Sequence, residues 1–464
     1  MQLVKSITLK KIKELYGYRL ALFTLFICLF LAGTAQDNSP YSRYGIGDIV
    51  PSTNITSRGM GGISAAYYDA ISINFNNPAS YSSFQTFLEQ NKKKLASGRA
   101  VLDVGLNFES RTLRENNNPE KFVASNALFS YLQVGVPLQK NWGLSLGLRP
   151  ISRISYKILR RELLIDPITQ LPIDTASTLF TGDGGVYLPT IGTGYKIKNF
   201  SIGANIGYLF GKKNYSTKRR IFNDSVPYLQ SNHETKTTFG NIFFTGGVQY
   251  DISLSKQSTL TLGAYGNFKR ELEASQDLVR ETYYRDFTSG DTRLDSVYEQ
   301  KNMMGTLVYP SSFGVGFVIR KNLADPKKTG LILGMDLIQT KWSDYQFYGM
   351  GDSVRNNWEL RAGAQIRPIV QKGYFSKVSY RAGFFIGPDY IKVNNKLNQY
   401  GFSFGMAMPL TSTDRFSMNQ LTILNLAFEY IKRGNNNNLL RENMFRLSAG
   451  LSLSDLWFFK RKYE

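Results

Sequence analysis

The sequence predicts an all-β protein, namely a transmembrane antiparallel β-barrel of about 14 strands. From about residue 98 onward, apolar and polar residues alternate in block after block, which gives each expected strand one apolar and one polar face. The blocks often run for 12 to 16 residues, whereas strands of globular proteins average about five or six. A soluble sandwich also alternates, but long strands joined by alternating short and long connections are typical of an outer-membrane barrel.

The chain begins with a basic stretch, which includes Lys5 and Arg19, and continues with the apolar run Leu20–Ala32. The small residues Gly33–Ala35 follow, so we expect residues 1–35 to be a cleaved secretory signal peptide. The alternative is an uncleaved anchor, although the run is short for a bilayer span. No later run of 18 apolar residues predicts a membrane-spanning helix.

Residues 98–464 are expected to form the barrel domain. In the block that starts at Trp142, for example, Leu144 and Leu146 share one face, with Ser and Gly between them. The expected strands cover residues 98–113, 126–138, 142–158, 184–198, 200–215, 236–250, 258–272, 302–320, 329–345, 353–368, 374–389, 399–410, 420–433 and 442–457. The four longest gaps, which are expected to be loops on one side of the membrane, cover residues 114–125, 159–183, 216–235 and 273–301.

Residues 36–97 lie between the signal and the first expected strand. They include the stretch Ser57–Ser80, whose glycines and small residues allow the backbone to pack closely against a barrel wall. This stretch resembles the N-terminal hatch of the FadL family of outer-membrane transporters. The residues that carry the resemblance are Arg58, Gly59, Gly61, Gly62, Asn77, Pro78 and Ala79.

The resemblance implies a monomeric barrel in the outer membrane of a Gram-negative bacterium, with residues 36–97 as a hatch that plugs the lumen. It also implies that hydrophobic ligands bind near the hatch and leave sideways through a kinked third strand. Pro150 falls in the third expected strand, where proline cannot donate a hydrogen bond to the sheet. Arg149 and Pro150 are therefore the candidate kink. The alternative is that a strand ends there and an irregular extension begins.

The sequence offers little for catalysis. The only cysteine, Cys28, lies in the expected signal, and the only histidine, His233, lies in an expected loop beside Glu234. These residues cannot form a Cys–His site or a zinc cluster, and a Ser–His phospholipase would depend wholly on His233. The glycine-rich Gly182–Gly185 lacks the strand–loop–helix context of a phosphate-binding loop, so we expect ordinary loop geometry there. We therefore expect no enzyme, no cofactor and no metal site.

The formal net charge is +21, and about +17 remains without the expected signal. For an exported protein, we expect this basic surface to contact outer-membrane lipid, lipopolysaccharide phosphates or another outer-membrane protein, and not nucleic acid. The stretch Gly211–Arg220 contains five basic residues and is a candidate phosphate-facing patch. The alternative is a solvated end of a strand and its loop.

The C-terminal sequence SDLWFFKRKYE and the Asn- and Lys-rich composition resemble Bacteroidota members of the FadL superfamily. The resemblance implies a channel for uptake of hydrophobic solutes such as long-chain fatty acids, with a hydrophobic small molecule as ligand. The alternative is a non-transporting barrel subunit of an outer-membrane protein-export or assembly complex, because FadL-like barrels of that phylum also serve protein-export machinery. A shared fold does not decide between these functions.

Overall fold

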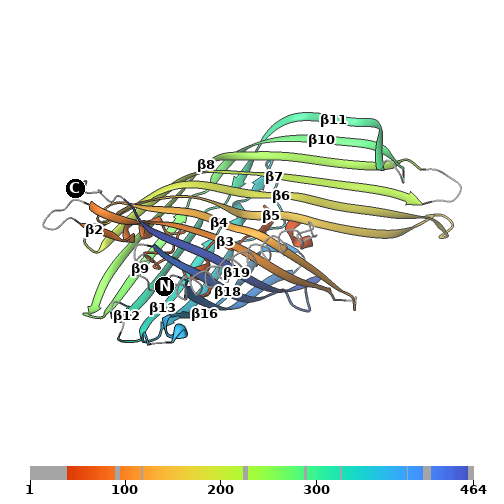
Figure 1. Ribbon diagram of the computed structural model, residues 1–464. Helices are drawn as coiled ribbons and strands as arrows, with labels where there is room; N and C mark the ends of the chain where they lie inside the picture. Colours follow the sequence, from red (N-terminus) through yellow and green to blue (C-terminus); the bar gives the residue numbers. More distant parts are fainter. Residues whose placement is uncertain are drawn as a thin grey trace, which may run out of the picture.

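The computed structural model describes residues 39–88, 95–116, 119–222, 228–286, 290–323, 325, 327–371, 373–393, 395–410 and 420–457. The expected signal peptide, residues 1–35, and the basic tail after Trp457 lie outside the described residues. The strands form one antiparallel sheet that closes on itself, because β19 (Leu440–Trp457) pairs with β3 (Leu95–Glu115) (Figure 1). The prediction of an all-β barrel of 14 strands is confirmed.

Most barrel strands are single elements, whereas β9 with β10 and β11 with β12 each make one barrel strand between them. The remaining barrel elements, with their bounds, are β4 (Lys121–Gln139), β5 (Trp142–Ile165), β6 (Pro172–Ile197), β7 (Phe200–Phe222), β8 (Gln230–Ser255), β9 (Ser258–Asn267), β10 (Arg270–Asp286), β11 (Gly290–Tyr309), β12 (Ser312–Lys321), β13 (Gly330–Thr340), β15 (Asn357–Arg367), β16 (Ser379–Val393), β17 (Asn395–Pro409) and β18 (Gln420–Arg433).

The short elements lie in the N-terminal segment and in the connections. They are the 3₁₀-helices η1 (Pro40–Arg43), η2 (Pro78–Ser83), η3 (Trp342–Asp344) and η4 (Tyr374–Lys377), the helical turn α2 (Ile55–Arg58), and the strands β1 (Asp48–Ile49), β2 (Thr86–Leu88) and β14 (Gln346–Phe347). No helix in the described part of the chain is long and apolar enough to cross a bilayer.

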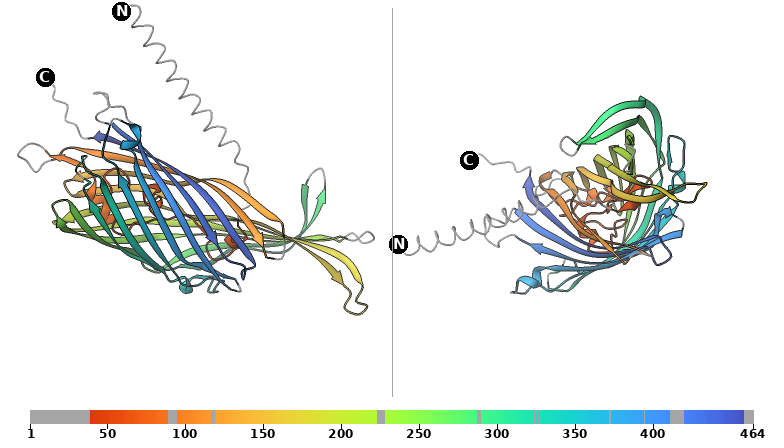
Figure 2. Two further views of the ribbon diagram at one scale, coloured as in Figure 1. Left: turned by 90° about the horizontal axis from the view of Figure 1, so that it is seen from below. Right: turned by 90° about the vertical axis from the view of Figure 1, so that its right-hand side faces the viewer.

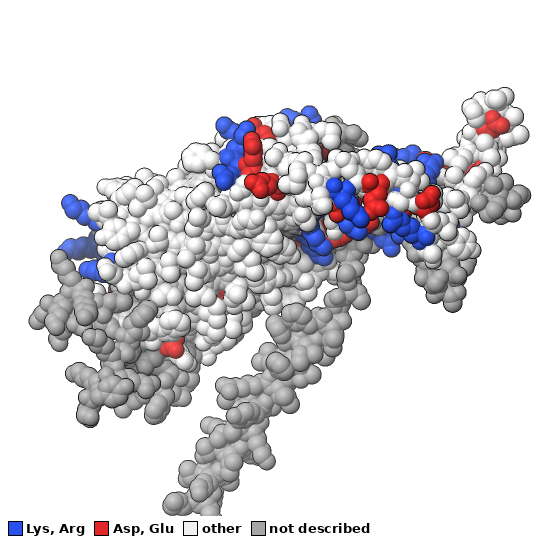
Figure 3. Space-filling view, turned by 90° about the horizontal axis from the view of Figure 1, so that it is seen from above, with Lys and Arg blue, Asp and Glu red and all other residues white. Residues whose placement is uncertain are grey.

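Side chains alternate between the outside and the lumen, as the two-residue period of a strand requires. On β7, Phe200, Ile206 and Phe210 are exposed on the outside, whereas Ser201 and Asn205 are buried inside. The space-filling view shows the result as a broad band with few charged side chains, between charged groups at both ends (Figure 3). An apolar outer band on a closed sheet is the arrangement that a bilayer demands.

The N-terminal segment, residues 39–84, lies within the ring of strands and is largely buried (Figure 2). Glycines on the wall allow its backbone to approach closely. A Cβ on Gly363 would lie 2.1 Å from the carbonyl oxygen of Met60, and a Cβ on Gly203 would lie 2.3 Å from the carbonyl carbon of Pro78. The segment is therefore fitted against the wall with no room for side chains at these points.

Three of the expected loops are wrong. Residues 159–183, 216–235 and 273–301 contain the long ends of β5, β6, β7, β8, β10 and β11, which run beyond the barrel on one side (Figures 1 and 2). We call residues 154–165, 172–184, 211–222 and 230–241, together with β10 and β11, the projecting sheet. β5 alone continues for 15 residues past Pro150, which is a length of about 50 Å. The alternating pattern fades there because neither face of these strand ends meets the acyl chains of the bilayer.

Candidate functional site in the lumen

The first anchor of the N-terminal segment is Arg58, at the end of α2. Its side chain is 2% exposed. One terminal nitrogen donates to Asn107 Oδ1 at 2.5 Å and Ser448 Oγ at 3.0 Å, and the other donates to Thr53 O and Ser130 Oγ at 2.8 and 2.9 Å. These bonds tie the helical turn to β3, β4 and β19. Burial lowers the pKa of Arg58 to about 10, so the cation persists at neutral pH.

The second anchor is the glycine pair that follows. Gly61 and Gly62 have φ angles of +67° and +86°, which glycine adopts without steric cost. Gly61 N–H donates to Ser403 Oγ at 2.8 Å, and Arg361 donates to Gly62 O at 2.9 Å. A side chain on Gly61 would lie 2.6 Å from the carbonyl oxygen of Ala362. Gly59 is different, because its φ of −60° is ordinary.

The third anchor is Asn77, which caps η2. Its side-chain oxygen accepts a hydrogen bond from Ala79 N–H at 3.1 Å, and its amide nitrogen donates to Ala65 O at 2.6 Å and Val248 O at 3.1 Å. Pro78 occupies the first position of η2, where its missing N–H costs nothing. The motif residues singled out in the sequence thus contact three different arcs of the barrel wall.

A buried charged cluster, which the sequence analysis missed, holds the first part of the segment. Asp48 lies 2.5 Å from Arg111 and 3.1 Å from Arg433, and Glu442 lies 3.0 and 3.3 Å from the same two guanidinium groups. Arg433 also pairs with Asp389 at 2.7 Å. We call these five residues the charged cluster. Four of its members, namely Arg111, Asp389, Arg433 and Glu442, lie buried on barrel strands, and the alternating pattern could have identified them as lumen-facing charges.

Acid should loosen this anchor. Burial raises the pKa of Asp48, but Arg111 and Arg433 outweigh burial and lower the pKa below its usual value. A lowered folded-state pKa stabilises the fold fully above the unfolded value of about 4, and this stabilisation is lost as the pH falls below it. We expect pepsin to cut residues 39–49 increasingly below about pH 4. An Asp48→Asn variant should lose this pH dependence, and an unchanged dependence would contradict the assignment.

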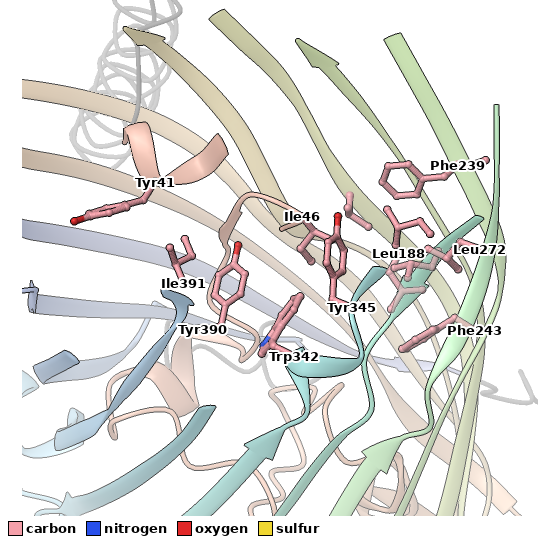
Figure 4. Packing of buried hydrophobic residues seen from close by; sticks show 14 of the residues in the cluster. Tyr41, Ile46, Leu188, Phe239, Phe243, Leu272, Trp342, Tyr345, Tyr390 and Ile391 are labelled. Carbon is pink, nitrogen blue, oxygen red and sulfur yellow. The ribbon is translucent and has the colours of Figure 1, made fainter. Parts of the chain in front are cut away.

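An apolar cluster closes the lumen at the end that faces the projecting sheet (Figure 4). Tyr41 and Ile46 of the N-terminal segment pack there with Trp342, Tyr345 and Tyr390 of the barrel connections and strands. The rings of Trp342 and Tyr390 are 4.3 Å apart between centroids. The Tyr390 hydroxyl donates to the backbone of the segment, as does the hydroxyl of Tyr345. The protein's own side chains therefore fill this end of the lumen.

A cavity of about 290 Å³ remains between the apolar cluster and the charged cluster. Apolar side chains such as Leu188, Phe243 and Tyr309 line part of it. Its charged lining residues are Asp48, Arg58, Arg111, Arg149, Glu359, Arg361, Asp389, Glu429, Arg433, Glu442 and Arg446. Pockets for hydrophobic ligands are lined mainly by apolar groups. Transfer of a hydrocarbon from water into this charged cavity would therefore contribute little binding free energy.

The wall is incompletely paired between β4 and β5. The two strands pair only over Leu132–Gln139 and Trp142–Leu148. Beyond that, residues 121–131 of β4 pair with β3, and β5 pairs with β6. β1 of the N-terminal segment pairs with the free edge of β5 at two residues, Ser152 and Arg153. We call this unpaired stretch the β4–β5 seam.

Pro150 lies where the seam begins. β5 does not end there: it continues as a strand, with a shift of its register against β6 between Pro150 and Ser152. The side chain of Arg149 points into the lumen, where it donates to Ser52 O at 3.0 Å and Asn76 Oδ1 at 3.2 Å. Among the described residues, no carboxylate pairs with Arg149.

The other candidates of the sequence lie on the projecting sheet. His233 lies on β8, where it pairs with Thr217 of β7, so its expected loop is wrong. Gly182–Gly185 lies within β6, so the loop expected there is also wrong. A Cβ on Gly185 would lie 2.5 Å from Ser152 O. The basic stretch Gly211–Arg220 is part of β7.

One family model matches almost the whole chain, from residue 12 to residue 464, and its description is BamG. The chain belongs to the BamG family. No curated protein matches this BamG-family sequence. Among solved structures, it is similar to a FadL homologue of Pseudomonas aeruginosa, with a TM-score of 0.50 and 15% identity over 89% of this chain and 100% of the other.

Two further solved structures are similar to the BamG-family barrel. The Pseudomonas putida toluene transporter TodX has a TM-score of 0.48 and 14% identity, over 89% of this chain and 99% of that one. The monoaromatic hydrocarbon channel CymD has a TM-score of 0.48 and 15% identity, over 89% and 98%. At such identities the likeness to the Pseudomonas aeruginosa FadL homologue concerns the fold alone.

Proposed function

We propose that this BamG-family chain is a plugged, non-transporting barrel subunit of an outer-membrane protein assembly, and that its projecting sheet binds a partner protein. One observation carries the proposal, namely the apolar hairpin in which β5 turns into β6. Six large aliphatic side chains there are each at least 53% exposed, namely Leu159, Leu163, Ile165, Ile168, Leu171 and Ile173. Exposed apolar patches of this kind mark interaction surfaces.

The position of the hairpin favours a protein over acyl chains as its cover. The outer apolar band ends on neighbouring strands at Tyr187 and Phe210, whose rings stack at 6.0 Å. Apart from Leu159, the aliphatic residues of the hairpin lie farther along the strands, beyond the exposed cations Lys157, Arg160 and Arg161. Acyl chains of the bilayer would have to pass this charged zone to reach it. A protein partner can reach the aliphatic side chains of the hairpin without crossing this zone.

The same proposal assigns the N-terminal segment the role of a permanent plug. This plug corresponds to the hatch domain expected at residues 36–97. Arg58, the glycine pair and Asn77 hold it to the wall, and the apolar and charged clusters close the rest of the lumen. These residues do not form the mostly apolar pocket that a hydrocarbon channel requires.

The partner is tested by isolation of the barrel from its native membrane in mild detergent. We expect the wild-type chain to bring a second protein with it in a fixed ratio. A Leu163→Asp, Ile168→Asp, Leu171→Asp variant should lose that protein, because three carboxylates cannot be buried in an apolar interface. Met350→Asp is the control, since Met350 is 68% exposed on a different connection. Recovery of the wild-type barrel alone would contradict the proposal.

Uptake of hydrophobic solutes such as long-chain fatty acids is the second candidate, because a specific observation favours it. The β4–β5 seam begins at Pro150 of the third barrel strand, and Arg149 beside it has no carboxylate partner among the described residues. A fatty acid could place its carboxylate at Arg149 and leave through the seam. This function requires slower uptake of labelled long-chain fatty acid in a strain with Arg149→Ala, whereas the subunit function requires no change.

A further inference from the structure

We infer that the outward face of the projecting sheet, where it leaves the apolar band, binds the phosphates of phosphorylated lipid A in the outer leaflet. This inference concerns a surface and a ligand that the subunit function does not need. It stands on the placement of the cations of β5, β7 and β8 by strand register.

The register puts these cations on the same face as the lipid-facing side chains. Tyr187 pairs directly with Phe210, so the two share the outer face, and Lys212 lies two residues beyond Phe210 on that face. Arg153 pairs with Gly185, which pairs with Lys212. The first pair of cations therefore lies about 7 Å along the strands from the last aromatic pair of the band.

The next rows continue the pattern. Lys157 is level with Thr181 and Ser216, and Arg161 is level with Ser177 and Arg220. The outward cations of these strands are Arg153, Lys157, Arg161, Lys212, Lys218, Arg220 and Lys236. We call them the basic patch.

Few carboxylates balance the basic patch. On the same face of β5 to β8, the described acidic residues are Asp183 and Glu234. Asp183 pairs with Lys212 at 3.2 Å and Glu234 pairs with Lys236 at 3.1 Å. A terminal nitrogen of Arg153 is buried and has no hydrogen-bond partner among the described residues. Among the described residues, no carboxylate forms an ion pair with Lys157, Arg161 or Arg220, so these three cations are available for an anion.

The patch also has a border. On β10, the neighbour of β8, Glu271 and Glu273 are exposed, so the positive surface stops there (Figure 3 shows both signs of charge at this end of the molecule). Continuity with the lipid band together with a local excess of positive charge fits a lipid whose phosphates lie directly above its acyl chains. Binding of this lipid would be more specific than a general attraction of anions to the patch. Its phosphates would contact the cations while its acyl chains lie on Tyr187 and Phe210.

The test is binding of purified, detergent-solubilised full-length protein to lipid A, followed by native mass spectrometry. We expect a Lys157→Gln, Arg161→Gln, Lys212→Gln, Arg220→Gln variant to bind lipid A at least about tenfold more weakly than the wild type. A Lys256→Gln, Lys321→Gln variant removes charge from the opposite end of the barrel and should bind as the wild type does. Dephosphorylated lipid A should bind weakly to all three.

A second variant tests the same inference through an expected increase in affinity. Poor folding of the first variant could lower its affinity, but poor folding cannot explain tighter binding by the second. Asp183→Asn with Glu234→Gln removes the two carboxylates of the patch, and we expect tighter binding of lipid A. Equal binding of lipid A and its dephosphorylated form would overturn the inference. So would an equal loss in the Lys256 and Lys321 control, or capture of an acidic protein in place of the lipid.

Discussion

Replacement of Gly383 by alanine is expected to release the N-terminal segment from the barrel wall. Gly383 lies in the middle of β16, and a Cβ there would lie 2.0 Å from Gly61 N and 2.2 Å from the carbonyl carbon of Met60. β16 is a regular strand at this point, so alanine itself suits the wall. The clash is with the backbone of the segment, which cannot yield as a flexible side chain would.

The expected cost is about 3 kcal/mol or more, the upper range for overpacking of a filled core. Displacement of Gly61 breaks its hydrogen bond to Ser403, and Arg58, three residues earlier, should lose its burial. Trypsin cleavage after Arg58 is therefore the readout, because the 2% exposed side chain is protected in the native protein. N-terminal sequencing should find a fragment that begins at Gly59.

Gly246→Ala is the matched control. Gly246 is also in a barrel strand, but no atom lies within 4 Å of the place where its Cβ would be. This variant should resist trypsin as the wild type does. If Gly383→Ala resisted trypsin equally well, the segment would not be seated on β16, and the description of the plug would be wrong.

Loss of Arg433 is expected to destabilise the folded protein by about 3–5 kcal/mol, the range for removal of one partner from a buried ion pair. Its guanidinium lies 3.1 Å from Asp48, 2.7 Å from Asp389 and 3.3 Å from Glu442. In Arg433→Met, Asp48 and Glu442 keep only Arg111 of the charged cluster, and Asp389 keeps no cation of the cluster. We expect a lower urea concentration at the midpoint of unfolding in detergent, measured by the loss of heat-modifiable migration on gels.

Arg160→Met provides the comparison. Arg160 pairs with Glu162 at 3.4 Å, but its side chain is 70% exposed, and such surface pairs contribute about 0–1 kcal/mol. Its unfolding midpoint should stay near that of the wild type. Equal midpoints for the Arg433 and Arg160 variants would show that the charged cluster does not hold the segment in place.

The barrel could be predicted from sequence because its two environments differ. Trp142 and Leu146 face outward, and Ser145, between them, faces the lumen. The alternation therefore predicted both the presence of the strand and which of its faces points outward. The short turns, such as residues 139–141, were equally visible. In the lumen, Arg58, Gly61 and Asn77 were singled out by resemblance, and the structure gives each of them a contact with the wall.

The projecting sheet could not be predicted in this way. Residues 159–165 read LRRELLI, with no alternation, because acyl chains do not select apolar side chains on either face. Strand order there is maintained by backbone pairing with neighbours, which a single sequence does not display. The charged cluster was missed for another reason: Asp48 and Arg433 are 385 residues apart, and only the closed barrel brings them together.

A photo-crosslinking residue at Ile168 of the apolar hairpin, introduced in living cells, tests the proposed subunit function most directly. Ile168 is 89% exposed, and the account predicts a covalent adduct with one specific protein. The same photo-crosslinking residue in place of Phe244 should give no such adduct. Phe244 lies on the apolar band of β8 and is 56% exposed. If neither Ile168 nor Leu163 nor Leu171 gave a protein adduct in the native membrane, the hairpin would not be a binding surface and the proposed function would fail.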